Sequence, residues 1–194
     1  MKKFLGLNKV KTAIFISGTG SNFKNLYKFS LSKNSPIKVE IVISNNSKAK
    51  GINFAKKKKI NNKIFSFKNK IRDENKILSF LKNRDVTLIC LAGFMRILSK
   101  NFIKKFSGKI LNVHPSLLPK YKGLNTHERV IKNKEKFSGC TVHYVNSKLD
   151  SGKIILQKKV KIAKNDTPKN LAKRILAKEH QLYIQAISKL YSNH

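Results

Sequence analysis

The sequence is poor in acidic residues, cysteine and tryptophan. Its 194 residues include nine aspartates and glutamates, two cysteines and no tryptophan, against 43 lysines and arginines. Two cysteines do not make a disulfide framework, so we expect Cys90 and Cys140 to be reduced core residues of a cytoplasmic protein. No apolar run approaches the roughly 18 residues of a membrane helix. The apolar stretch after Lys3 is too short for a secretory signal, so we expect no membrane association.

The scarcity of acids leaves a net charge of +34, which is compatible with nucleic-acid binding. The lysines are nevertheless spread over the whole chain, with one tight cluster at Lys56 to Lys59, and asparagine and isoleucine are also plentiful. These residue types share A- and T-rich codons, so a codon-biased genome would produce this composition without selection for a partner. We therefore expect no nucleic-acid partner, although the charge would attract small anionic substrates.

Strand-like and helix-like segments alternate through the first part of the chain, with apolar runs at 12–17, 39–44, 63–67, 86–92 and 110–113. Such continuous runs, separated by helical patterns, are typical of parallel strands. They predict an α/β fold, an open and mostly parallel twisted sheet with helices on both faces.

The last third of the chain has a different pattern. Segments 139–145 and 154–162 predict an antiparallel strand pair, and 167–191 predicts a long final helix with Thr167 as its N-cap. The length fits a single domain over 1–194, in which residues 1–10 form a loose basic extension.

A glycine-containing loop, Ser17-Gly18-Thr19-Gly20-Ser21-Asn22, follows the first strand and opens a helix. Glycines let the backbone approach an anion, and the free amides at a helix start point toward it. The loop lacks the third glycine of a dinucleotide fingerprint and the Gly-Lys-Ser/Thr of a Walker A loop. It favours a site for a single phosphate, and the alternative is an ordinary glycine turn capped by Ser21.

Asn112 and His114 lie two residues apart on a strand that Pro115 ends, so both face the same side near the carboxyl end. An amide donor beside an imidazole suits oxyanion stabilisation in acyl transfer, and a histidine can move a proton near neutral pH. No serine or cysteine nucleophile accompanies them, which favours direct attack by a substrate amine. The alternative is a hydrogen-bonded histidine and asparagine in a turn.

Asp150 lies in a turn between two expected strands, from which its carboxylate can reach an imidazole and stabilise its protonated form. A simple turn aspartate is the alternative. No histidine, cysteine or aspartate cluster has metal-site spacing, so we expect no metal. His127 and His143 are interpreted as buried hydrogen-bonding residues without a primary role.

Taken together, these segments resemble the folate-dependent phosphoribosylglycinamide formyltransferases of purine synthesis. The resemblance spans residues 11–185 and lies in a phosphate loop, a folate-binding segment, a catalytic strand with its loop, and an aspartate loop, at 16–22, 91–98, 112–121 and 149–152. It implies a Rossmann-like formyltransferase fold. It also implies transfer of the formyl group of 10-formyltetrahydrofolate, the co-substrate, to the amine of glycinamide ribonucleotide.

The resemblance also implies a role for each matching residue. The ribonucleotide would be bound at its phosphate by Gly20, Ser21 and Asn22, and at its glycinamide end by Glu179. The folate would be bound by Arg72, Met95, Arg96, Ile97, Leu98 and Asn112. Asn112 and His114 would stabilise the tetrahedral intermediate, and Asp150 would assist proton transfer. Ser151 stands where the family commonly has glycine, and a positive φ there would strain it. The oligomeric state, monomer or homodimer, stays open.

Three other functions are compatible with parts of the sequence. Methionyl-tRNA formyltransferase shares the Asn-x-His-Pro element, and its RNA substrate would suit the charge, but it carries a further C-terminal domain. Formyltetrahydrofolate hydrolase usually has an additional N-terminal domain, and we expect neither domain in this chain. A nucleic-acid-binding protein with a degenerate enzyme fold would have lost its catalytic residues, whereas Asn112, His114 and Asp150 are all present.

Overall fold

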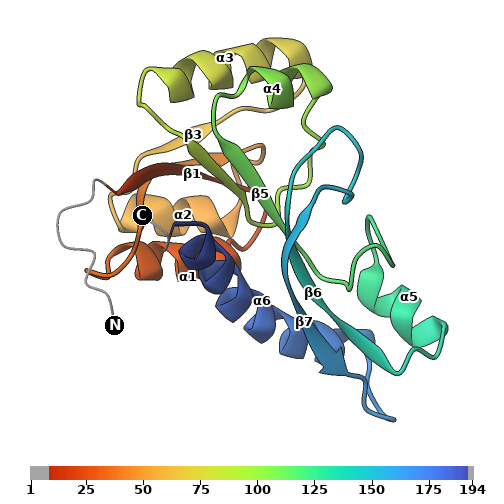
Figure 1. The fold of residues 1–194 in the computed structure, drawn as a ribbon. Helices are drawn as coiled ribbons and strands as arrows, with labels where there is room; N and C mark the ends of the chain where they lie inside the picture. Colours follow the sequence, from red (N-terminus) through yellow and green to blue (C-terminus); the bar gives the residue numbers. More distant parts are fainter. Residues whose placement is uncertain (1–8, 192–194) are drawn as a thin grey trace. The chain divides into compact units, whose positions relative to one another are not determined.

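The computed structural model describes residues 9–191, which form two compact units. The first comprises residues 9–111 together with residue 191, and the second comprises 112–190. Figure 1 follows the chain from red at the N-terminus to blue at the C-terminus. The single domain expected over 1–194 remains a prediction.

The expected basic extension is shorter than the sequence indicated. Strand β1 spans Val10–Ile16. Lys9 donates from Nζ to the carbonyl oxygens of Ser30 and Ser32, over 3.0 and 2.8 Å. Lys9 and Val10 therefore belong to the folded part of the chain, and residues 1–8 of the expected extension lie outside the described residues.

The sheet of the first unit is parallel and has β1 at its centre. Strands follow the order β3-β2-β1-β4-β5, with bounds Asn62–Ile64, Ile37–Ser44, Val10–Ile16, Leu88–Leu91 and Lys109–His114. β1 pairs in parallel with both β2 and β4, and its residues from Ala13 to Ile16 are fully buried. A strand covered on both faces needs a continuous apolar run rather than an alternating pattern, which explains why β1 was recognisable in the sequence.

Four helices accompany this sheet: α1 Ser21–Ser30, α2 Lys50–Lys57, α3 Lys70–Lys82 and α4 Lys100–Lys105. Helices α1 and α2 lie on one side of the sheet, and α3 and α4 lie on the other (Figure 1). Asn69 and Ser99 cap α3 and α4 by accepting hydrogen bonds from Arg72 N and Phe102 N. The first helix is different, because its N-cap is Gly20 at φ 69° with no side-chain cap. The interpretation of Ser21 as a capping residue is therefore wrong.

The second unit contains the end of β5 and the antiparallel part of the sheet. Its strand order is β5-β6-β7, with β6 at Phe137–Tyr144 and β7 at Ile154–Lys161. Gly139 allows this pairing, because a Cβ there would lie 2.1 Å from the Lys158 carbonyl oxygen. Helix α6 spans Pro168–Tyr191, and Thr167 Oγ1 accepts from Asn170 N as expected of its N-cap.

The predicted fold class is confirmed: the sheet is mostly parallel, with C-terminal antiparallel strands and a long final helix. One helix was missed, α5 at Thr126–Lys132. It has only seven residues and starts after Asn125, which adopts a left-handed conformation and provides no side-chain cap. A helix this short shows no long periodic pattern that could indicate it.

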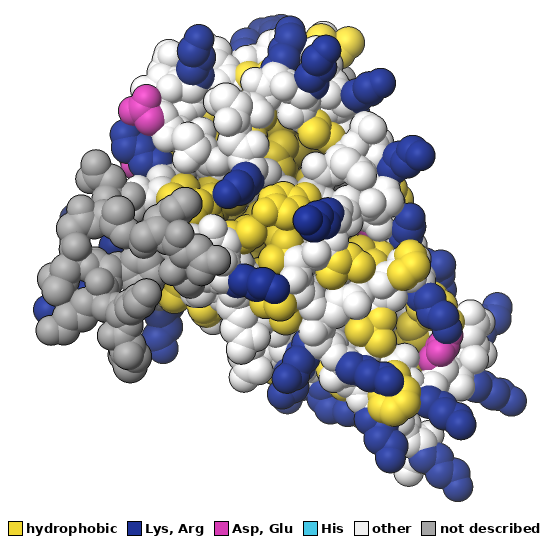
Figure 2. All heavy atoms as spheres, viewed as in Figure 1, with side chains coloured by type: hydrophobic (Ala, Val, Ile, Leu, Met, Phe, Trp, Pro, Cys, Tyr) yellow, Lys and Arg dark blue, Asp and Glu magenta, His cyan; other side chains and the backbone are white. Residues whose placement is uncertain are grey.

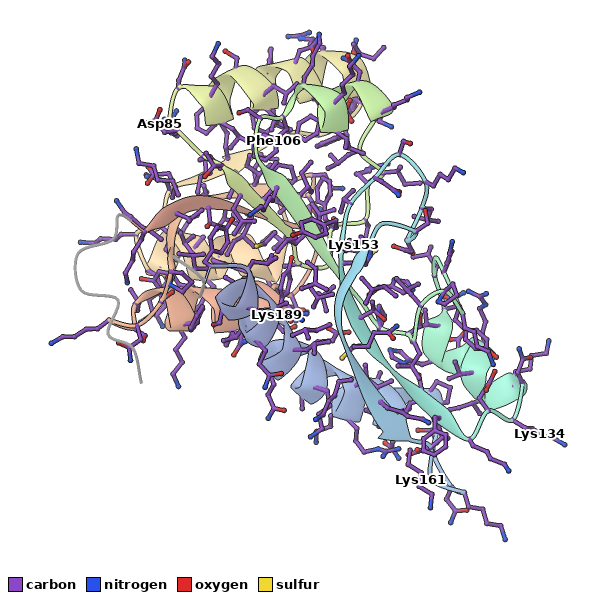
Figure 3. The ribbon with its side chains drawn as sticks, viewed as in Figure 1. Asp85, Phe106, Lys134, Lys153, Lys161 and Lys189 are labelled. Carbon is purple, nitrogen blue, oxygen red and sulfur yellow. The ribbon has the colours of Figure 1, made fainter. Side chains whose placement is uncertain are left out.

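Basic side chains are dispersed rather than gathered. Figure 2 shows Lys and Arg scattered over the visible face, with few acidic side chains among them. Lys134 follows α5 and Lys161 ends β7, and both are exposed (Figure 3). Between residues 9 and 191, no helix has the length and apolarity needed to cross a membrane.

Candidate active site

Three polar side chains of the second unit meet around the carboxylate of Asp150, which is 9% exposed. His114 Nδ1 lies 3.4 Å from Asp150 Oδ2, and Asn112 Nδ2 donates to Oδ1 over 3.4 Å. His143 Nε2 lies 3.7 Å from the same Oδ1. The structure thus brings together Asn112, His114 and Asp150, and adds a second histidine to them.

The backbone explains how these side chains converge. Asn112 and His114 share one face at the carboxyl end of β5, and His143 lies on β6, the next strand of the sheet. Asp150 follows β6 in a turn and has φ 44°. Its Oδ2 accepts from Gly123 N over 2.8 Å, which holds the carboxylate in place.

The expected strain at Ser151 is absent, because the positive φ falls on Asp150 instead. Ser151 Oγ donates to the Lys148 carbonyl over 2.9 Å, so the serine stabilises the turn with its own side chain. An aspartate tolerates the left-handed region better than most residues. The glycine-to-serine difference at position 151 therefore needs no backbone distortion.

The ring of His114 is held by acceptors at both nitrogens. Nδ1 faces the Asp150 carboxylate, and Nε2 lies 2.8 Å from the carbonyl oxygen of Tyr121. Neither a carboxylate nor a carbonyl oxygen can donate, and a neutral imidazole has only one N–H. The single N–H of a neutral ring can therefore donate to only one of these two acceptors, and a second proton would be needed to donate to both.

His143 is held as a neutral ring with its Nε2 unprotonated. Its Nδ1 lies 2.8 Å from the Tyr144 carbonyl oxygen and must donate there, which leaves Nε2 to accept from Asn112 Nδ2 over 3.2 Å. Burial lowers the pKa of His143 below its ordinary value, against the opposing effects of the Tyr144 carbonyl and the Asp150 charge. His143 therefore acts as an acceptor that orients the Asn112 amide.

Tyr121 is itself anchored through its phenol. Its hydroxyl donates to Glu135 Oε1 over 2.9 Å, and Lys120 Nζ lies 3.0 Å from the same oxygen. Both contacts lower the pKa of Glu135, the lysine contributing most, so this carboxylate is held ionised. The hydrogen bond to Glu135 thus anchors the side chain of Tyr121, the residue whose backbone carbonyl oxygen lies against His114 Nε2.

The phosphate loop lies in the first unit, between β1 and α1. Gly51 N donates to the Gly18 carbonyl over 3.0 Å, and a Cβ on Gly20 would lie 3.0 Å from Gly51 Cα. Two glycines are therefore needed for this close approach of backbones. Ser21 is half-buried and Asn22 is 7% exposed, and both lie in the first turn of α1, where backbone amides point out of the helix start.

The expected folate-binding segment, residues 91–98, also lies in the first unit, and its last six residues are segment 93–98. Met95 and Ile97 are 62% and 63% exposed, and Arg96 is exposed as well, whereas Leu98 is buried. Two large apolar side chains that face solvent side by side are suited to an apolar ligand surface.

The two remaining site residues lie apart from these groups along the chain. Arg72 is exposed in the first turn of α3, and across residues 9–191 no hydrogen bond or ion pair joins its side chain to segment 93–98. Glu179 is buried on α6.

Burial, with a smaller contribution from the Glu179 charge, raises the pKa of the Cys140 thiol to about 12. Both cysteines are free thiols.

Sequence reasoning missed two contributors to the Asp150 cluster. His143 was recognised as a buried residue, and its position on the strand next to β5 could have suggested its contact with Asn112. The Tyr121 carbonyl had no side-chain signal at all. Within the described part of the chain, no group of three or more potential metal ligands is placed to hold an ion.

Comparison with known proteins adds a family. A model of the formyl transferase family matches residues 10–187. The phosphoribosylglycinamide formyltransferase of Haemophilus influenzae is 42% identical over 176 residues, which cover 89% of this chain and 83% of that protein. The human trifunctional purine biosynthetic protein adenosine-3 is 39% identical over 182 residues. That match covers 92% of this chain and 18% of the human protein, so the chain spans less than a fifth of its trifunctional relatives.

Solved structures agree with this relationship. A crystal structure of phosphoribosylglycinamide formyltransferase from Brucella melitensis matches with a TM-score of 0.90 and 38% identity, over 96% of this chain and 98% of that one. The corresponding protein from Anaplasma phagocytophilum matches with a TM-score of 0.87 and 42% identity, over 93% and 85%.

Proposed function

Because the chain belongs to the formyl transferase family, we propose that it is a phosphoribosylglycinamide formyltransferase of purine synthesis. It would transfer the formyl group of 10-formyltetrahydrofolate to the amine of glycinamide ribonucleotide. The relatives that carry this name are up to 42% identical over most of the chain. We assign to this chain the formyl-transfer step alone and none of the other activities of the trifunctional relatives.

The observation that carries the proposal is the cluster of Asn112, His114 and Asp150 within hydrogen-bond or ion-pair distance. Formyl transfer needs a group that stabilises a negatively charged tetrahedral intermediate and a group that moves a proton. An amide and an imidazole supply these two functions, and a carboxylate supports the charged imidazole.

The reaction needs no enzyme nucleophile. The substrate amine would attack the formyl carbon, forming a new C–N bond, and the former carbonyl oxygen would become an oxyanion. Collapse of this intermediate would break the bond to the folate nitrogen, which takes a proton, while the attacking amine loses one. The folate nitrogen would take its proton from His114, and the proton that the amine loses would return to His114 with the help of Asp150, so atoms and charges balance.

Asn112 would stabilise the oxyanion with one of its two amide hydrogens. Both are engaged within the protein, one with His143 Nε2 at 3.2 Å and one with Asp150 Oδ1 at 3.4 Å. The longer bond is the weaker one, so the hydrogen directed at Asp150 is the one that an oxyanion would take. His143 would keep the amide oriented throughout.

The proposed substrate contacts are those that the family resemblance assigns. Gly20, Ser21 and Asn22 would hold the ribonucleotide phosphate with backbone amides and side-chain donors, and Glu179 would bind the glycinamide ammonium or amide. For the folate, Met95 and Ile97 offer exposed apolar surface, Arg96 and Leu98 complete the segment, and Asn112 and Arg72 are further proposed contacts.

No metal is part of the proposal. A cytoplasmic location agrees with the free thiols of Cys90 and Cys140. A monomer and a homodimer both fit the proposal.

The test is a formyl-transfer assay with purified protein, 10-formyltetrahydrofolate and glycinamide ribonucleotide, in which the folate product is followed by absorbance. We expect turnover that depends on the ribonucleotide. Equal turnover without ribonucleotide would indicate a hydrolase instead. Folded protein that binds folate but forms no product would refute the proposed acceptor, and initiator methionyl-tRNA would be tested next.

A further inference from the structure

Ser17 stands at the junction of the phosphate loop and the folate-binding segment. It follows the last residue of β1, and its Oγ accepts from the backbone N of Met95 over 2.7 Å. Its own backbone N donates to the Gly93 carbonyl over 3.0 Å. Two hydrogen bonds therefore attach the first residues of segment 93–98 to the first residue of the phosphate loop.

The hydroxyl of Ser17 has a defined orientation. It donates its single proton to Asn45 Oδ1, so its remaining lone pairs face the Met95 amide. Asn46 Nδ2 also donates to the Ser17 carbonyl over 3.3 Å. The two residues that follow β2 thus both hydrogen-bond to Ser17.

The far end of the same segment has a separate anchor. Ser99 N donates over 2.8 Å to Oε1 of Glu74, a carboxylate that is 3% exposed. Between the anchors, the Phe94 ring packs at 5.3 Å from Phe15 and at 5.5 Å from Phe67. The exposed side chains of segment 93–98 therefore project from a backbone that is hydrogen-bonded at both ends, and Ser17 is the partner that belongs to the phosphate loop.

We propose that Ser17 couples the two substrate sites, so that an anion bound in the phosphate loop orders the folate-binding segment and tightens folate binding. The inference rests on the proposed function. An anion that accepts hydrogen bonds from the amides after Gly20 would reduce the motion of the phosphate loop. Ser17 would then move less as well, and its hydrogen bond to the Met95 amide would become more stable. When one ligand has already ordered the segment, the second ligand binds with a smaller loss of conformational entropy. Each ligand would therefore increase the affinity for the other by the same factor.

The test measures hydrogen exchange of the Met95 amide with and without glycinamide ribonucleotide. Four proteins are compared: the natural chain, Ser17→Ala, Ser17→Thr and Ser47→Ala. The threonine retains the hydroxyl, and Ser47 is an exposed serine two residues beyond Asn45. Calorimetry of ribonucleotide binding and of tetrahydrofolate binding accompanies each exchange measurement.

In the natural chain, we expect the ribonucleotide to slow Met95 exchange and to tighten tetrahydrofolate binding. Ser17→Ala should exchange about fivefold faster without ligand, the equivalent of one net hydrogen bond. It should still bind ribonucleotide but lose both responses to it, whereas Ser17→Thr and Ser47→Ala should keep them.

Two results would overturn the inference in distinguishable ways. Ribonucleotide that binds the natural chain without changing Met95 exchange or folate affinity would refute the coupling and leave the proposed function standing. The same holds if Ser17→Ala responds as the natural chain does. Ribonucleotide that fails to bind the folded natural chain at all would overturn both the proposed function and the coupling that rests on it.

Discussion

Replacing Asp150 by asparagine tests the central cluster with the smallest possible change of shape. The carboxylate accepts from Gly123 N at 2.8 Å through Oδ2 and from Asn112 Nδ2 at 3.4 Å through Oδ1. An amide must place its NH2 group at one of these two positions. In either position a donor meets a donor, and a buried donor is left unsatisfied, which costs about 1–3 kcal/mol of folding stability.

The effect on the reaction should be larger than the effect on stability. His114 Nδ1 faces Oδ2 at 3.4 Å, so Asp150→Asn removes the charge that favours the protonated ring. Positioned proton transfer contributes on the order of 10²- to 10⁴-fold to a rate, and we expect kcat to fall within that range. The KM for the ribonucleotide should change little, because Asp150 is not among the groups that we assign to its binding.

The assay is ribonucleotide-dependent formyl transfer, combined with denaturant unfolding of the same preparation. Glu128→Gln is the matched control, since it makes the same chemical change on the exposed side of α5. A folded Asp150→Asn protein that retains a kcat within about threefold of the natural chain would fall far outside this range and refute the assigned role.

Three further outcomes follow from the structure. His114→Ala should lower turnover by about 10²-fold or more while leaving far-UV circular dichroism unchanged, and a folded, fully active variant would contradict its role. Gly139→Ala should cost about 1–3 kcal/mol or more in denaturant unfolding, because its Cβ would lie 2.1 Å from the Lys158 carbonyl. Gly18→Ala, where a Cβ meets nothing within 4 Å, is its control, and equal stability of the two would be contrary to expectation. Burial holds the pKa of His143 below its ordinary 6.5. As the pH falls, the unfolded chain therefore takes up a proton at this histidine at a higher pH than the folded chain does. Stability is then full above that value and falls as pH drops below it, by at most about 1.4 kcal/mol per pH unit for this group. Thermal unfolding at about pH 7.5 and about pH 5.5 checks this, and a melting temperature that rises on acidification would reverse the sign.

The architecture was predictable because its strands carry local signals. β1 and β4 are buried on both faces, and their continuous apolar runs are legible without knowledge of their neighbours. The end of β5 was marked by Pro115, and the start of α6 by Thr167 and Pro168. Helix α5 had no comparable signal, because it is short and begins at a residue that provides no cap.

The candidate site was predictable only in part. Asn112 and His114 share a strand face, so their common orientation follows from the two-residue period of a strand. His143 was predicted to be a buried hydrogen-bonding residue without a primary role, and its contact with Asn112 depends on which strand lies beside β5. The sequence raised the question whether Ser151 takes a positive φ, and the structure places that conformation at Asp150, because local sequence does not determine which residue of a turn adopts it.

The sequence by itself determined the order of the strands and of every helix except α5, the residue types at the site and the dispersed positive charge. These properties depend on neighbours along the chain, through side-chain periodicity, glycine placement and composition. Only the tertiary structure decided that His114 meets acceptors at both nitrogens, that His143 orients Asn112, and that Ser17 binds the Met95 amide. These contacts join residues 7 to 78 positions apart, often through backbone groups. A backbone carbonyl or amide is the same in every residue, so only folding specifies which one a side chain meets.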